Sequence, residues 1–515
     1  MAEHFKSDLF FLIKGMSGNE KSYYKKLAKR HAVNNQALHL RLFDLIEKNS
    51  AYDEKKIQDH LSVATPARFS SLKNYLGKEV LDTLVFLNRN DDLGIQLSFI
   101  LAQIEQLLEK KLLQMARKLF SKAWELASSF ELYDVQVSLL RMQSRMLEFR
   151  SFKEYKAQSG NIAALLRKAL HYHHMQQQLH FLFEQLQTLK KITLLRFTDE
   201  QHAEVMEIKK ALLELKPKAE ESEWTLIMQY NALALCEHML FEFEECRQHC
   251  RHMLEFWQRN PAFIGVYPEY FLNSANTDFY NLFALKDIEQ VAHHLSAYRL
   301  LAEANIRNEY SRKQWEIIAF NTILKINHKT GNYDKVAVLV NEKAAGVMSF
   351  ARQVLPPSEM LSVITSTCIS YFVLGQWKEA EDLIFDIKEL NREINREDIF
   401  YFTVIFHLLI IYEQKESLRL DSAIEAAYHL LYARKKLRPF EKQIMLFLKR
   451  LAATKGQADI AALILPFLQD LDKYKNDPVK KLYFLYFNYY GWLESKMQGV
   501  TYRNYIVRKI AEDNA

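Results

Sequence analysis

The 515-residue sequence predicts an all-α protein built as a solenoid of helix pairs, and three observations support this fold class. Glycine and proline are scarce, with 12 and 9 residues, so the chain has few of the residues that tight turns use. Apolar residues recur at helical spacing over long stretches. An apolar residue on the turn side also recurs about every 45 residues, a length that two helices and short connections would fill.

The first 95 residues do not follow this period and predict a separate N-terminal helical module. Ser17 and Glu20 have the spacing of a capping box at the start of a helix. Further helices are expected over residues 34–47, 53–61 and 69–87. We therefore expect two parts, an N-terminal module over 1–95 and a solenoid of about nine helix pairs over 96–515.

The clearest repeat unit covers residues 368–390. An apolar helix leads to a turn at Gly375 and Gln376, and Trp377 then precedes a second amphipathic helix that contains the small residue Ala380. Similar turn positions recur at intervals of 38 to 46 residues, at Leu113, Phe152, Phe197, Phe243, Ile288, Tyr333, Trp377, Leu420 and Ala458. Each pair would bury its apolar faces against its neighbours, so the core would run along the whole stack.

This turn pattern resembles the tetratricopeptide repeat, in which a glycine ends the first helix, an aromatic packs in the turn and a small residue allows close approach. The resemblance implies a right-handed α-α superhelix whose first helices line a concave groove. The period here exceeds the 34 residues of that repeat. The order of a short helical head and a repeat body is also similar to an uncharacterised group of bacterial proteins, which implies no known activity.

One column of asparagines marks a candidate binding surface. Asn231, Asn276 and Asn321 lie 45 residues apart, each in the middle of a first helix. An asparagine amide can both donate to and accept from the backbone of a bound peptide. The same helix faces continue through Leu235, Tyr280, Lys325, His238, Phe283 and His328. We interpret this surface as a groove for a peptide or partner helix, with chance spacing of a common residue as the alternative.

The other clusters have simpler interpretations. The cysteines and histidines Cys236, His238, Cys246, His249, Cys250 and His252 could ligate zinc, but Cys246 and Cys250 align with core positions of other repeats. The histidines His171, His173, His174 and His180 favour a solvated helix face over a metal patch. The aromatic residues Tyr483, Phe484, Tyr486, Phe487, Tyr489 and Tyr490 favour a core and terminal cap over a ligand platform.

No sequence motif predicts catalysis. The phosphate-binding and hydrolase patterns GxGxxG, GxxxxGK[ST], HExxH and GxSxG do not occur. We therefore expect a non-enzymatic protein without a cofactor or bound metal. The leading hypothesis is a protein–protein interaction scaffold that holds a peptide or a partner helix.

The alternative hypothesis is a nucleic-acid-associated regulator, in which residues 56–76 act as a helix-turn-helix and the solenoid as a sensor. Phosphate contacts would come from Lys55, Lys56, Arg68, Lys73 and Lys78. Residues 1–95 contain 15 basic and 12 acidic residues, a weak excess for a DNA-binding module.

The positive charge is concentrated at the C-terminal end. Residues 431–515 contain 16 lysines and arginines against 8 acidic residues, although the whole chain carries only +6. The basic residues Arg434, Lys435, Lys436, Arg438, Lys449, Arg450, Lys480, Lys481, Arg508 and Lys509 could contact phosphates, but a solvated cap on the last repeat is the simpler interpretation.

The expected location is the cytoplasm. The N-terminus lacks the basic start and long apolar core of a secretory signal. The longest apolar stretch, residues 399–412, is too short to span a bilayer, and the four cysteines are too few for a disulfide-stabilised fold.

Overall fold

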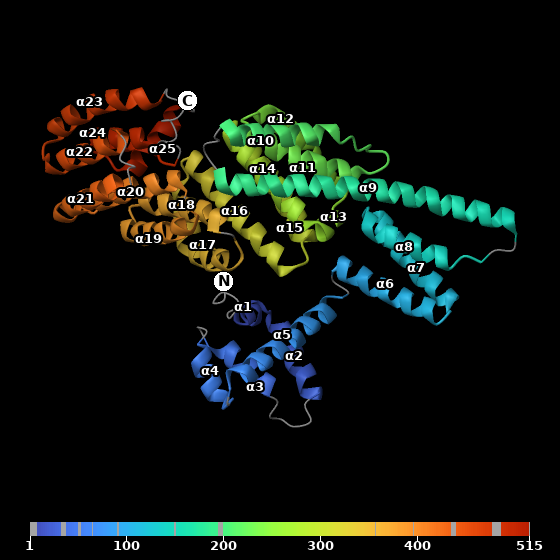
Figure 1. Ribbon diagram of the computed structural model, residues 1–515. Coiled ribbons are helices and arrows are strands. Elements are labelled where there is room, and N and C mark those ends of the chain that lie inside the picture. Colours follow the sequence, from blue (N-terminus) through green and yellow to red (C-terminus); the bar gives the residue numbers. More distant parts are fainter. Residues whose placement is uncertain are drawn as a thin grey trace. The chain divides into compact units, whose positions relative to one another are not determined.

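The computed structural model describes residues 8–31, 38–49, 53–63, 65–89, 92–148, 151–193, 199–355, 357–394, 396–433, 439–475 and 486–513. Within these ranges every regular element is an α-helix, and consecutive helices pack against each other (Figure 1). The prediction of an all-α, repeat-like chain is therefore confirmed. The chain forms two compact units, Met1–Leu170 and His171–Ala515.

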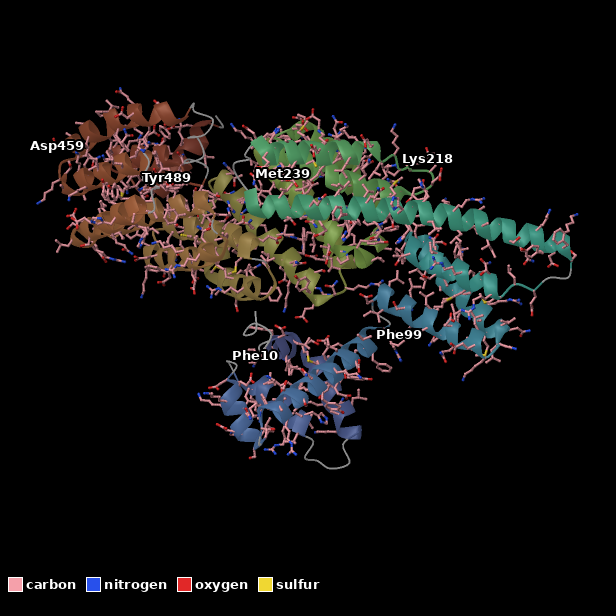
Figure 2. All side chains as sticks on the ribbon, viewed as in Figure 1. Phe10, Phe99, Lys218, Met239, Asp459 and Tyr489 are labelled. Carbon is pink, nitrogen blue, oxygen red and sulfur yellow. The ribbon has the colours of Figure 1, made fainter. Side chains whose placement is uncertain are left out.

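The first unit begins with helices that share one apolar core, which includes Phe10, Phe43 and Leu76 (Figure 2). The predicted capping box is confirmed, because Ser17 N donates to Glu20 Oε2 at 2.7 Å and Glu20 N donates to Ser17 Oγ at 3.3 Å. These helices are α1 (Asp8–Gly15), α2 (Gly18–His31), α3 (Leu38–Lys48), α4 (Glu54–Leu61) and α5 (Pro66–Asn88).

A second apolar cluster in this unit joins α6 (Leu93–Glu109), α7 (Leu113–Ser129) and α8 (Tyr133–Arg145). Ala116 and Ala123 of α7 are fully buried in it. The sequence-based boundary at residue 95 lies near the start of α6, whereas the compact units divide at Leu170.

Helix α9 (Phe152–Thr193) differs from the expected pattern of short helices, because it continues without a break for 42 residues. The spacing of Phe152 and Phe197 suggested two helices with a connection between them. After Gly160, however, the segment contains no glycine or proline and is rich in alanine, leucine, glutamine and lysine. These residues favour helix throughout, so nothing in the sequence ends the helix until Thr193.

The second unit continues with regular helix pairs. The predicted turn residues Phe243, Ile288, Tyr333 and Trp377 are each the first residue of the second helix of a pair. The helices are α10 (Asp199–Glu214), α11 (Glu223–Met239), α12 (Phe243–Arg259), α13 (Ala262–Val266), α14 (Pro268–Ala284), α15 (Ile288–Asn305), α16 (Glu309–Lys329), α17 (Tyr333–Val354), α18 (Pro357–Val373), α19 (Trp377–Ile394), α20 (Glu397–Glu413), α21 (Ser417–Ala433), α22 (Pro439–Ala453), α23 (Gln457–Lys475), α24 (Tyr489–Met497) and α25 (Tyr502–Asp513). Leu420 and Ala458 lie within α21 and α23, and Phe197 lies outside the described residues.

The turns within the pairs share one backbone geometry. Most of them contain a residue with positive φ, which is glycine at Gly331 (72°) and Gly375 (76°) but Lys286 (61°) and Lys415 (60°) at other turns. The chain then bonds back to the end of the first helix, as in the bond from Gln376 N to Tyr371 O. This is a Schellman-type helix ending. The repeat therefore keeps its turn shape even where it lacks glycine, which explains the low glycine content.

Candidate binding site on the first helices

The predicted asparagine column lies in the first helices α11, α14 and α16, but its members differ in their contacts. Asn231 is buried, and its Nδ2 donates to Tyr270 O at 3.1 Å and to Ser274 Oγ at 2.8 Å. These bonds tie α11 to α14. Asn321 is buried with an unpartnered Oδ1, and Asn276 is half-buried. Asn231 therefore has a structural role, and a binding role for the column stays a prediction.

Helix α9 lies along the surface of these first helices (Figure 1). Its Gln176 donates to Thr225 of α11 at 3.1 Å, and its Gln187 donates to Asn273 of α14 at 2.9 Å. Between them, Phe183 stacks on Tyr270 with ring centroids 5.6 Å apart. We call the face of α11, α14, α16, α18 and α20 that meets α9 and the C-terminal residues the first-helix surface.

The side chains of α9 that meet this surface follow helical spacing. Tyr172, Met175, Leu179, Phe183 and Leu186 are all buried, at intervals of three and four residues. His180 Nδ1 lies 3.4 Å from the hydroxyl of Tyr270. Of the histidine group proposed as a solvated face, His171, His174 and His180 are exposed and His173 is half-buried. The second unit thus contains an amphipathic helix seated on its own first helices.

The C-terminal residues cover the other end of the first-helix surface. Phe487 packs on Phe372 of α18 and Phe406 of α20, with ring centroids 5.3 and 5.0 Å apart. Trp492 Nε1 donates to Glu413 of α20 at 2.6 Å. Phe487 and Tyr489 are buried, so the described part of the aromatic stripe forms core, as expected (Figure 2). Tyr483 and Phe484 lie outside the described residues.

A group of polar side chains lies between these two covers, and we call it the first-helix cluster. It consists of His238 of α11, Tyr280 and Asn281 of α14, Lys325 of α16, and Lys190 at the end of α9, whose charge acts on His238 and Tyr280. Lys325 Nζ lies 4.1 Å from the Tyr280 ring centroid, and the His238 and Tyr280 rings are 6.4 Å apart. Three of the seven predicted site residues are therefore neighbours.

The charges of the cluster act on its neutral groups. Burial and the nearby Lys190 ammonium lower the pKa of His238 to about 4, so the imidazole is neutral at pH 7. Burial raises the pKa of Tyr280, but the Lys325 charge, a hydrogen bond with Ser362 at 2.9 Å and the Lys190 charge outweigh it and lower that pKa. The local field is therefore positive.

His328 belongs to a separate contact. Its Nε2 lies 2.7 Å from Ser370 Oγ of α18, and its ring is 5.3 Å from that of Tyr333. Burial and the charge of Lys329 lower its pKa to about 4. Phe283 lies closer to the cluster, with its ring centroid 5.9 Å from Lys325 Nζ, and Leu235 is buried in the core.

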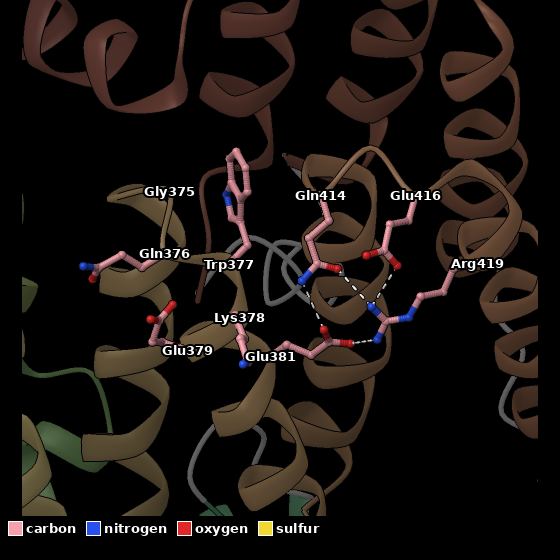
Figure 3. A pocket seen from close by; sticks show the side chains of 9 residues that line it. All are labelled: Gly375, Gln376, Trp377, Lys378, Glu379, Glu381, Gln414, Glu416 and Arg419. Atoms are coloured by element: carbon pink, nitrogen blue, oxygen red, sulfur yellow. Dashed lines mark hydrogen bonds and ion pairs between the residues drawn. The ribbon is translucent and has the colours of Figure 1, made fainter.

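An open hollow of about 700 Å³ lies elsewhere, at the turns of the pairs α18–α19 and α20–α21 (Figure 3). Glu381 is its central charge, and it accepts hydrogen bonds from His407 Nε2 at 2.9 Å, Gln414 Nε2 at 3.1 Å and the Arg419 guanidinium. Burial raises the pKa of Glu381, but these donors outweigh it and lower that pKa. No sequence pattern predicts this network, because its members come from three helices and form no motif.

The cysteine and histidine cluster is part of the core. Cys246 and Cys250 are fully buried with their sulfurs 3.9 Å apart, which confirms their expected core positions. His249 Nδ1 contacts Glu237 at 2.8 Å, whereas Cys236 is buried without a ligand set around it. Among the described residues, no three histidine, cysteine or acidic side chains are grouped so that they could hold a metal ion.

The basic residues of the nucleic-acid hypothesis lie on α4 and α5. Lys73 Nζ forms an ion pair with Glu54 at 3.1 Å, and Lys56 Nζ lies 3.3 Å from Asp53. Lys55, Arg68 and Lys78 are exposed. Two of the five proposed phosphate contacts therefore already have carboxylate partners.

Three described residues of the basic C-terminal block also lie near acids, and a fourth, Arg450, is exposed. Lys449 lies 3.8 Å from Asp421, and Arg508 and Lys509 lie 3.6 and 3.9 Å from Glu512. The remaining residues of the block that fall outside the described ranges are Arg434, Lys435, Lys436, Arg438, Lys480 and Lys481.

No protein-family model matches this chain, and no curated protein or solved structure is significantly similar to it. None of the described helices combines the length and the apolar character that crossing a bilayer requires.

Proposed function

We propose that this chain is a non-catalytic scaffold that binds a peptide or a partner helix on its first-helix surface. In a right-handed, tetratricopeptide-like superhelix this surface would be the concave groove. The four cysteines are free and buried, which supports a reducing compartment such as the cytoplasm for this scaffold.

The main support for this proposal is the packing of α9 against the first helices α11 and α14. A helix-binding groove accepts an amphipathic helix through anchors at intervals of three, four and seven residues. Helix α9 meets α11 and α14 in this way, with Leu179, Phe183 and Leu186 buried and with Gln176 and Gln187 bonded at the edges. The surface is therefore suited to a helix, and a partner of similar pattern would fit it.

The exposed end of this surface would supply the partner contacts. Asn273, Asn276 and Tyr280 follow one face of α14, and α9 contacts the first of them through Gln187. Asn276 forms no hydrogen bond with another described side chain. Its amide is thus available to a bound backbone, as is the half-buried side chain of Lys325.

The test uses the whole chain, affinity-purified from native lysate, with recovered proteins identified by mass spectrometry. Each candidate is then purified and titrated directly against wild type and Asn276→Ala. We expect Asn276→Ala to weaken binding about tenfold, because one half-buried side chain that would hydrogen-bond the partner is lost. Asn504→Ala, an exposed asparagine of α25, is the matched control and should change affinity by less than about twofold. If every recovered protein binds wild type and Asn276→Ala equally well, this surface is not the partner site.

A further inference from the structure

The lysines of the first-helix cluster differ from three other half-buried lysines of this chain, Lys25, Lys209 and Lys496, in having no carboxylate partner. Lys25 pairs with Asp44 at 2.8 Å and Glu47 at 2.5 Å, Lys209 pairs with Glu237 at 3.5 Å, and Lys496 pairs with Glu413 at 2.5 Å. Lys190 and Lys325 are also half-buried, yet within the described ranges neither forms an ion pair. Leaving a partly desolvated ammonium unpaired is unfavourable, so a partner from outside the chain would stabilise it.

The cluster also contains a buried nitrogen with no partner. His238 Nδ1 is shielded from solvent and has no hydrogen-bond partner among the described residues, and the Oδ1 of the neighbouring Asn281 has none either. Burial lowers the pKa of His238, whereas Asn281 favours the protonated imidazole and so raises that pKa. Its imidazole is neutral, so one ring nitrogen carries a proton that it can donate. Unpartnered buried polar atoms are rare because each costs about 1–3 kcal/mol, and they often mark the place of an unseen ligand.

Two polar groups beside the lysines can act as donors, the His238 imidazole and the Tyr280 hydroxyl, whereas the buried Asn281 Oδ1 is an acceptor. The Tyr280 hydroxyl carries a proton and bonds to the Ser362 hydroxyl at 2.9 Å. The charged side chains that act on His238 and Tyr280 are lysines: Lys190 acts on both, and Lys325 acts on Tyr280. The arrangement therefore favours an acceptor with negative charge.

The amount of charge indicates which anion fits. Two ammonium groups supply a charge of about +2, which a phosphate group of about −1.5 to −2 at pH 7 neutralises. A carboxylate would neutralise only one of them. Lysine binds phosphate as a compact point charge, and the rings of Tyr280 and Phe283 form apolar walls beside Lys325.

We propose that Lys190, His238, Tyr280 and Lys325 form a binding site for a phosphate group carried by a small molecule. This goes beyond the proposed function, because it concerns a small anion and would hold whether or not a protein partner binds. The aromatic walls favour an aryl or heterocyclic phosphate over free inorganic phosphate.

The first experiment titrates the full-length protein with phenyl phosphate, inorganic phosphate and acetate, using calorimetry and the ³¹P resonance of the ligands. We expect phenyl phosphate to bind more tightly than inorganic phosphate, and acetate to bind about tenfold more weakly than either. Tighter binding of inorganic phosphate than phenyl phosphate would assign the site to the free ion. Equal binding of acetate and the phosphates would overturn the proposal.

The second experiment places the binding site. Lys325→Gln and Lys190→Gln should each weaken phenyl phosphate binding about tenfold, because each removes one charge-assisted contact. Lys329→Gln, an exposed lysine on the same helix as Lys325, is the control and should leave binding within about twofold. Circular dichroism verifies that each variant is folded. If Lys325→Gln does not fold, Lys190→Gln alone tests the site, because Lys190 lies at the end of α9. Equal affinity of wild type and Lys190→Gln for phenyl phosphate would overturn the proposed site.

Discussion

The first-helix cluster and the Glu381 network are both groups of polar and charged side chains, but they satisfy their charges differently. Around Glu381, an arginine, a histidine and a glutamine all contact one carboxylate. In the first-helix cluster, two lysines, a tyrosine and a histidine meet without a carboxylate. The Glu381 network therefore holds α19, α20 and α21 together, whereas the two lysines of the first-helix cluster have no carboxylate partner among the described residues.

The hollow in Figure 3 shows why concavity alone is a poor guide to function. Arg419, which lines it, also bonds Gln414 and Glu416, both at 3.1 Å. A ligand there would have to replace interactions that the protein already makes, at a cost in free energy. The first-helix cluster would gain interactions with a ligand and lose few of its own.

The largest expected effect is a loss of folding stability at acid pH that originates in the first-helix cluster. Burial lowers the pKa of His238 to about 4, against about 6.5 in the unfolded chain, so the unfolded chain binds more protons in acid. The stability from neutral His238 is fully present above about pH 6.5 and declines by about 3 kcal/mol as the pH falls to 4. Urea unfolding of wild type and His238→Gln at pH 7 and pH 4.5 measures this difference.

The control for the acid prediction is His171→Gln, which changes an exposed histidine. The expected result is a shallower acid loss for His238→Gln and an unchanged loss for His171→Gln. Identical losses in wild type and His238→Gln would mean that His238 is not buried as a neutral group.

The next effect tests the Glu381 network as a structural joint. Glu381→Gln removes the charge that pairs with Arg419 and accepts from His407, and it should destabilise the fold by about 2 kcal/mol. This magnitude allows for the solvent exposure of Arg419, whose side chain is 43% accessible. The matched variant Glu416→Gln lies at the rim and should cost less than about 0.5 kcal/mol. Thermal unfolding of both proteins gives the comparison, and equal melting temperatures would contradict it.

A smaller effect compares a paired lysine with an unpaired one. Lys496→Gln leaves Glu413 without its ion-pair partner and should destabilise the protein by about 1 kcal/mol. Lys325→Gln removes a half-buried charge that has no ion-pair partner, so stability should stay equal or rise slightly. Chemical unfolding at low salt distinguishes the two outcomes. A larger loss for Lys325→Gln than for Lys496→Gln would show that Lys325 is needed by the fold itself.

The sequence predicted the repeat well because a repeat depends on local patterns. Phe243, Ile288, Tyr333 and Trp377 begin their helices where the period places them. The binding surface was less predictable, because the period cannot tell which asparagine would bond within the fold, as Asn231 does. The continuity of α9 was also missed, since residue spacing suggested a turn that the composition of that segment does not encode.

Sequence patterns do not predict contacts between residues that are distant in the sequence. The approach of Lys190 to His238 depends on where α9 lies against α11, and no local motif specifies that placement. The Glu381 network likewise joins residues from three helices. Both regions arise from tertiary packing, so only the structure could reveal that one is paired and the other is not.

The smallest expected effect concerns the two turns that border the Glu381 network. Gly375 and Lys415 both adopt positive φ, at 76° and 60°, although only glycine does so without strain. Gly375→Ala should therefore destabilise the protein by about 1 kcal/mol, while Lys415→Gly should stabilise it by about 0.5 kcal/mol. Differential scanning calorimetry of the two variants measures both signs. Because the substitutions change the turns without touching Glu381, matching shifts of the same sign would show that side-chain contacts at the turns outweigh backbone geometry.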